Sequence, residues 1–122
     1  MSRPVRQGDL YWIEAEVLRP SVPGVAHPHL VVQDDLFNAS RIPTLVVCAL
    51  TTRLARANEP GALLLEEGEG GLTRPSVVLP SRICVVDEAD LGAFIGRLSA
   101  ERVERVLDGL RFLQRSTRRP GD

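Results

Sequence analysis

The sequence predicts an α+β fold that is mainly β, a small and strongly bent sheet or barrel followed by one helix. Five or six short runs, each rich in branched or apolar residues, follow one another along most of the chain and are bounded by Pro, Gly, Asn or Asp. Residues 99–114 then repeat their apolar side chains at helical spacing. Short strands at such close intervals are typical of small barrels.

The candidate strands are the runs at residues 10–17, 29–33, 44–50, 62–66, 76–80 and 83–86. The first contains Tyr11 and Trp12 and alternates in part between apolar and polar residues. Residues 67–75 hold three glycines and a proline, and we therefore expect a loop there.

The helix has recognisable start signals and one apolar face. Ser99 is suited to cap its first turn, and Glu101 lies where the helix dipole favours a negative charge. We expect the apolar face to pack on the sheet. Its members are Val103, Val106, Leu107, Leu110 and Leu113.

Length and composition indicate one globular domain. The chain has 122 residues, enough for a single core, and we expect a domain of about residues 8–114 with a polar tail at 115–122. Hydrophobic residues make up 43% and charged residues 25%, a balance typical of a folded protein. All 15 basic residues are arginine, but the net charge is only -1, which argues against a broad surface for nucleic acid. Any contact with nucleic acid must then be local.

Hydropathy, the cysteines and a pair of aspartates bear on the cellular location, on the state of the thiols and on a possible metal site. No apolar run approaches the length of a membrane span, and the N-terminus lacks the apolar core of a signal peptide, so we expect a cytoplasmic protein. Cys48 and Cys84 lie in apolar runs without nearby ligand partners and are interpreted as buried thiols. Asp34 and Asp35 are interpreted as caps of a turn and a short helix, because no third metal ligand follows at a fixed spacing.

The most informative segment is residues 24–38, GVAHPHLVVQDDLFN. It contains both histidines of the chain, His27 and His29, on either side of Pro28. We expect His27 in a loop that ends at the proline, where an imidazole can exchange a proton near neutral pH. His29 follows in the strand and is interpreted as mainly structural.

Five segments follow one another in a recognisable order: GDLYWI (8–13), the glycine loop leading to a proline and LVVQDDLFN (30–38), VVCALTT (46–52), GEGGLTRPSVV (68–78) and VDEADLGAFIGRLSAERV (86–103). This order resembles the PemK/MazF family of toxin endoribonucleases from type II toxin–antitoxin systems. The resemblance extends from Gly8 to about Leu113, and it is the ordered set rather than any single motif that is specific.

The resemblance implies an SH3-like β-barrel decorated with helices, a homodimer, and cleavage of single-stranded RNA such as mRNA, which inhibits growth. In this family the reaction resembles attack of the ribose 2′-hydroxyl on the adjacent phosphate and needs neither metal nor cofactor. The reaction requires a base, an acid and donors to the phosphoryl oxygens. A cognate antitoxin with a largely disordered tail is the other implied partner.

Carried over by position, the family threonine falls on Thr51, with Thr52 in the following serine position. A strand-end hydroxyl there donates to a phosphoryl oxygen, although local hydrogen bonding that ends the strand also explains such threonines. The family arginine before the loop proline falls on His27. Histidine replaces a permanent phosphate clamp with a group suited to general acid or base catalysis.

A second departure from the family pattern lies at Ser81 and Arg82, where a polar or acidic residue and a glutamine are usual. Arg82 is a candidate to supply the phosphate contact that His27 no longer provides, and a solvated strand residue is an equally good interpretation of it. Arg53 and, after it, Arg56 follow Thr51 and are expected beside the RNA, and Arg19 lies in the first loop.

Two functions remain open at this point. One is an endoribonuclease toxin with His27 and Thr51 at its centre; the other is a catalytically weak relative that retains antitoxin binding. A peptide-binding SH3-like domain is disfavoured because the chain has few aromatic residues to line a groove.

Overall fold

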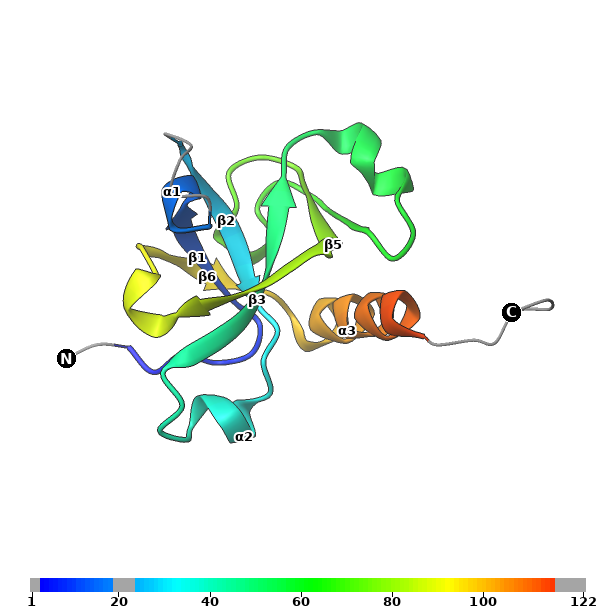
Figure 1. Ribbon diagram of the computed structural model, residues 1–122. Helices are drawn as coiled ribbons and strands as arrows, with labels where there is room; N and C mark the ends of the chain where they lie inside the picture. Colours follow the sequence, from blue (N-terminus) through cyan, green and yellow to red (C-terminus); the bar gives the residue numbers. More distant parts are fainter. Residues whose placement is uncertain (1–2, 19–23, 116–122) are drawn as a thin grey trace.

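Six strands form one antiparallel sheet within residues 3–18 and 24–115, which the computed structural model describes (Figure 1). Their order across the sheet is β4-β5-β3-β2-β1-β6. The strands are β1 (Asp9–Glu14), β2 (Ala26–Val31), β3 (Thr44–Thr51), β4 (Leu63–Leu65), β5 (Ser76–Asp87) and β6 (Phe94–Arg97).

The sheet curls into a half-barrel, and the C-terminal helix α3 (Ala100–Gln114) packs on it. The predicted mainly β, SH3-like barrel with a C-terminal helix is confirmed. The shorter elements are α1 (Ala15–Leu18), α2 (Asp35–Asn38) and three 3-10 turns, η1 (Leu54–Asn58), η2 (Glu69–Gly71) and η3 (Glu88–Asp90). No helix in the described ranges is long and apolar enough to cross a bilayer.

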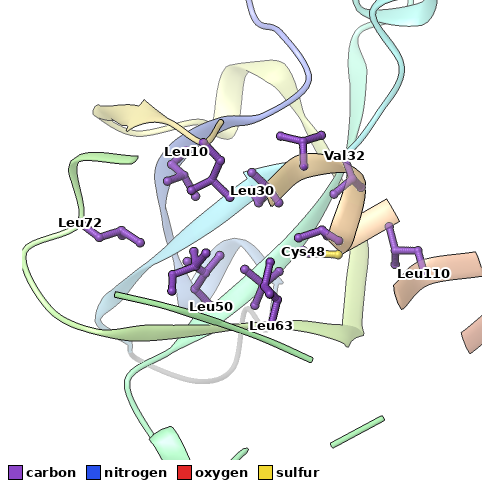
Figure 2. Close-up of a cluster of buried hydrophobic side chains, with 13 residues drawn as sticks. Leu10, Leu30, Val32, Cys48, Leu50, Leu63, Leu72 and Leu110 are labelled. Atoms are coloured by element: carbon purple, nitrogen blue, oxygen red, sulfur yellow. The ribbon is translucent and has the colours of Figure 1, made fainter. Parts of the chain in front are cut away.

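Each face of the sheet buries its own apolar cluster, because successive side chains of a strand point to opposite faces. On the first face, side chains from β1 to β5 meet α3 (Figure 2). Its fully buried members include Leu10, Leu30, Cys48, Val78 and, from α3, Val106. The second face buries Tyr11, Ile13, Val31, Leu45, Val47 and Val86.

The helix begins as the sequence predicts. The Ser99 hydroxyl accepts a hydrogen bond from the backbone N–H of Arg102 at 3.3 Å, and Val103, Val106 and Leu110 are buried. Leu113, which we expected on the packed face, is 47% exposed. It lies on the last turn of α3, beyond the part of the helix that meets the sheet.

Two runs that we predicted as separate strands form a single strand. The runs at 76–80 and 83–86 are parts of the single strand β5, which passes through Pro80. The register against β3 shifts between Cys48 and Leu50, so that residues 79–82 all stand opposite the single residue Ala49. A proline is tolerated inside a sheet at such an irregularity, because the ladder does not need its missing N–H there.

The first two strands also differ from the prediction at their ends. β1 stops at Glu14, and residues 15–17 belong to α1 (Ala15–Leu18), in which Ala15, Glu16 and Leu18 favour a helix over a strand. β2 begins at Ala26, so His27 lies in the strand and not in the predicted loop. The strand β6 was not predicted, since its four residues include a glycine and an arginine and pair with β1 only around a register shift.

Candidate active site

The strands β2 and β3 stop pairing at the point where the candidate residues lie. Their ladder covers Leu30 with Cys48 and ends with His29 opposite Ala49. Continuing this register by two residues sets His27 opposite Thr51, both on the face of the sheet that carries His29. The last observed pair is His29 with Ala49, so both predicted catalytic residues lie two residues beyond the end of this ladder, which we call the opening.

Pro28 explains why the ladder ends there. Its partner on β1, Trp12, gives its own N–H to Ala93 at 3.0 Å and accepts from the N–H of Gly92 at 2.6 Å, both away from β2. In an antiparallel pair, the backbone groups of Pro28 then also point away from β1 and towards β3. A proline has no N–H to donate on that side. The β2 edge facing the end of β3 is left without a donor at Pro28.

The two side chains at the opening differ in exposure. His27 is exposed, with its backbone paired to Ile13 of β1, and Thr51 is half-buried. The Thr51 hydroxyl oxygen accepts a hydrogen bond from the N–H of Arg53 at 3.2 Å. This is the local bond that ends a strand, and it leaves the hydroxyl hydrogen free to donate to another group.

A carboxylate absent from our sequence analysis connects the loop after β3 to β5. Glu59 forms an ion pair with Arg56 in η1 and accepts a hydrogen bond from the Ser81 hydroxyl at 3.0 Å. Arg56, then Ser81, and more weakly Arg82 hold the pKa of the Glu59 carboxyl below its usual value. Glu59 thus bonds to one predicted phosphate-binding residue, Arg56, and feels the charge of a second, Arg82. No sequence signal marks it, because its partner Ser81 is 22 residues away.

The predicted phosphate-binding residues differ in availability. The Arg56 guanidinium is engaged by Glu59, whereas Arg53 and Arg82 are exposed and form no ion pair with any residue in the described ranges. Thr52 is exposed beside Arg53. Arg19 lies outside the described residues.

His29 is buried one step inside the opening, at 2% exposure. Its Nδ1 lies 2.9 Å from the carbonyl oxygen of His27, and its Nε2 has no hydrogen-bond partner among the described residues. Burial lowers the pKa of this imidazole below its usual 6.5, and the neighbouring His27 ring acts in the same direction. The hydrogen bond to His27 opposes this shift without cancelling it.

The remaining candidates are structural. The Asp34 carboxylate accepts from the N–H of Leu36 at 2.8 Å and caps α2, as predicted, and Asp35 accepts from the N–H of Gln7 at 2.7 Å. Cys48 and Cys84 are free thiols; Cys48 is buried as predicted, whereas Cys84 is only half-buried. Burial raises the pKa of the Cys48 thiol to about 12. Across the described ranges, no three His, Cys, Asp or Glu side chains gather as a metal site.

Comparison with known proteins identifies the family. The family described as PemK-like, MazF-like toxin of type II toxin-antitoxin system matches residues 6–113. Endoribonuclease MazF6 of Mycobacterium tuberculosis is 32% identical over 107 residues, covering 88% of this chain and 94% of that protein. Endoribonuclease EndoA of Bacillus subtilis is 30% identical over 108 residues, covering 88% and 92%.

Solved structures agree in fold. The MazE-MazF structure (Form-II) from Deinococcus radiodurans superposes with a TM-score of 0.72 at 19% identity, covering 92% of this chain and 96% of that one. A mycobacterial endoribonuclease in complex with its cognate antitoxin gives 0.68 at 18% identity, covering 91% and 93%. With a family match over residues 6–113 and relatives above 30% identity along most of their length, the chain belongs to the PemK-like, MazF-like toxins of type II toxin–antitoxin systems.

Proposed function

We propose that this chain is the toxin of a type II toxin–antitoxin pair and an endoribonuclease that cleaves single-stranded RNA, including mRNA, to inhibit growth. The relatives named endoribonucleases support the activity. The observation that supports the mechanism is the end of the β2–β3 ladder at His29 and Ala49, two residues short of His27 on one strand and of Thr51 on the other. An exposed imidazole and a hydroxyl with a free hydrogen there supply a proton carrier and a donor to phosphate.

The proposed reaction is attack of a ribose 2′-hydroxyl on the adjacent phosphate. The 2′-oxygen forms a bond to phosphorus while the bond to the 5′-oxygen of the next nucleotide breaks, leaving a cyclic phosphate and a free 5′-hydroxyl. His27 exchanges a proton with the reacting oxygens, and the Thr51 hydroxyl donates to a phosphoryl oxygen. Arg53 and Arg82 hold flanking phosphates, with Thr52 and Arg56 in supporting roles. No step needs a metal or a cofactor.

The partners follow from the same family. Related structures are described as MazE-MazF and as an endoribonuclease with its cognate antitoxin, and we propose that an antitoxin binds this chain too. We also propose a homodimer, a cytoplasmic location, and activity confined to one domain of about residues 8–114. Sedimentation at micromolar concentration tests the dimer, with twice the 13.4 kDa chain mass expected.

Cleavage of a long single-stranded RNA in EDTA by the purified protein tests the function. We expect wild-type cleavage, with His27→Ala and Thr51→Ala each at least about 100-fold slower. Products are expected to carry a 5′-hydroxyl, seen as ready 5′-labelling by polynucleotide kinase without prior phosphatase treatment.

The control is Arg105→Ala, which changes an exposed residue of α3 that forms no ion pair in the described part of the chain. This variant is expected to cleave like wild type. An inert wild type, or cleavage that survives both His27→Ala and Thr51→Ala, would refute the proposal.

A further inference from the structure

His29 is a polar side chain in a position that packing alone does not explain. It lies between Tyr11 of β1 and Ala49 of β3, on the same face of the sheet as His27, and is 2% exposed. An aliphatic residue would fit the apolar cluster formed on this face by Ile13 and Val47. A histidine here instead buries two polar ring nitrogens, and each of them needs a hydrogen-bond partner.

The hydrogen bond of His29 defines its tautomer. A backbone carbonyl oxygen only accepts, so the 2.9 Å contact requires that Nδ1 carries the proton and donates to the oxygen of His27. Burial keeps the ring neutral by lowering its pKa. The Nε2 atom is then left as an acceptor, and no described group donates to it.

An unpartnered buried acceptor destabilises the folded protein. That cost is not required for folding, since an apolar side chain of similar volume would avoid it. The Nδ1 hydrogen bond is the feature of His29 that such a side chain lacks. Its acceptor is the backbone of the residue at the centre of the proposed reaction.

The segment that carries His27 is paired on one side only. Its backbone pairs with β1 through Ile13, but the ladder to β3 has already ended at His29. Pro28 brings no N–H to that side. The imidazole of His29 is thus a second restraint on a strand end that is otherwise held from one side.

We propose that His29 is a positioning residue for the ribonuclease reaction: its Nδ1–H holds the carbonyl of His27 and fixes the strand segment that presents the His27 imidazole beyond the end of the β2–β3 ladder. This inference rests on the proposed function. A shift of about 1 Å in a catalytic group lowers a rate by up to about 100-fold, so the restraint affects turnover more than substrate binding.

Three substitutions separate positioning from packing. In His29→Asn the side-chain amide nitrogen occupies nearly the place of Nδ1 and can donate to the same carbonyl. His29→Leu removes both nitrogens at similar volume, and His29→Gln keeps polarity but moves its donor one bond further. We expect the kcat of His29→Asn to be within about threefold of the wild-type value. The kcat values of His29→Leu and His29→Gln should be about 10- to 100-fold lower than wild type, while their KM values stay within about twofold of it.

Thermal melting supplies the contrasting measurement. His29→Leu is expected to unfold at or above the wild-type temperature, because it removes the unpartnered acceptor. A slower yet equally stable Leu variant, rescued by Asn, supports positioning. Equal kcat in Leu and wild type, or equal loss in Asn and Leu, would overturn it.

The wild-type protein provides a test that is independent of activity and of the folding of any variant. Two-dimensional NMR of the imidazole nitrogens assigns the tautomer, and we expect His29 to be neutral at pH 7 with its proton on Nδ1. A proton on Nε2 would overturn the proposal even if the enzyme cleaves RNA. An inert wild type with the expected tautomer would instead refute the proposed function and leave the hydrogen bond in place.

Discussion

His27 occupies the position where the family has an arginine, and the two side chains offer different chemistry to a phosphate. An arginine is a permanent cation and a forked donor, while an imidazole both accepts and donates a proton. In the structure His27 is exposed at the end of the β2–β3 ladder, where RNA has access to it. At this position, proton exchange and phosphate binding can be separated by one substitution.

We expect His27→Arg to bind RNA within about threefold of wild type and to cleave it about 100-fold more slowly. The guanidinium holds phosphate but does not give up its proton near neutral pH. Affinity is measured with a 2′-O-methyl RNA that cannot react, and cleavage by single-turnover kinetics. A His27→Arg variant as fast as wild type would show that this position requires only a cation.

The raised pKa of the Cys48 thiol predicts that the folded protein loses stability at high pH. Burial raises its pKa from 9.0 to about 12 in the folded protein, so above pH 9 the unfolded chain loses this proton while the folded chain retains it. The stabilising effect is complete below pH 9 and declines as pH rises towards 12. For this one thiol, the free energy of unfolding should be about 2 kcal/mol smaller at pH 10.5 than at pH 8.

Urea unfolding of wild type and Cys48→Val at pH 8 and 10.5 measures this contribution. Valine has a similar volume and no proton to lose, so the variant should show a smaller decline by about 2 kcal/mol. The comparison cancels other alkaline groups, including Tyr11 and Cys84, whose pKa values are also raised by burial. Parallel declines in the two proteins would contradict the prediction.

At the scale of elements, the loop that follows β3 is held at two points. Glu59 joins it to Ser81 of β5, and Gly61 lies directly against Gly109 of α3. A Cβ atom added to Gly109 would lie 2.4 Å from the carbonyl oxygen of Gly61, which is too close for a backbone atom to accommodate. The helix therefore supports the loop that carries Arg53.

We expect Gly109→Ala to lower the free energy of unfolding by about 1 to 2 kcal/mol. Alanine gains about 1 kcal/mol as a helix former, but the steric conflict with the Gly61 backbone costs more. Hydrogen exchange should also rise in residues 52–62. Arg105→Ala, an exposed change in the same helix, serves as the control. A stabilised Gly109→Ala protein would show that the loop yields freely and is not held by α3.

Local patterns in the sequence predicted the helix and most strands, because caps and periodic apolar residues act over short distances. They failed where pairing decides the structure. Pro80 divides the sequence pattern of β5, but the shift opposite Ala49 lets the strand continue. The four-residue β6 exists through its pairing with β1.

The candidate site was likewise predictable only in part, because contacts between distant residues decide the rest. His27 and Thr51 were identified by resemblance, and only the register shows that both lie just beyond the end of the β2–β3 ladder. Glu59 had no sequence signal, since one glutamate in a loop does not reveal that Ser81 and Arg56 will meet it. The hydrogen bond from His29 to the carbonyl of His27 likewise depends on a side-chain orientation that no spacing rule gives.

At the scale of the whole molecule, the charge is nearly balanced, and many arginines are already paired. The net charge is -1 with 15 arginines. Described ion pairs to carboxylates engage Arg3, Arg56, Arg97, Arg102 and Arg111. With a net charge near zero, we expect RNA binding to depend on a few local cations, for which Arg53 and Arg82 are proposed, rather than on a broad basic surface.

This balance predicts a weak dependence of RNA affinity on salt. Each phosphate neutralised on a single strand contributes about -0.7 to the slope of log K against log salt concentration, so Arg53 and Arg82 together give about -1.4 per chain and about -2.8 if both chains of a dimer hold one RNA. Fluorescence anisotropy with 2′-O-methyl RNA over a salt series measures the slope. Arg53→Ala and Arg82→Ala should each make it shallower by about 0.7 per contacting chain, while Arg105→Ala leaves it unchanged. A slope near -7, as about ten phosphate contacts would produce, would contradict a local site, because it requires a cationic surface that the paired arginines of this molecule do not provide.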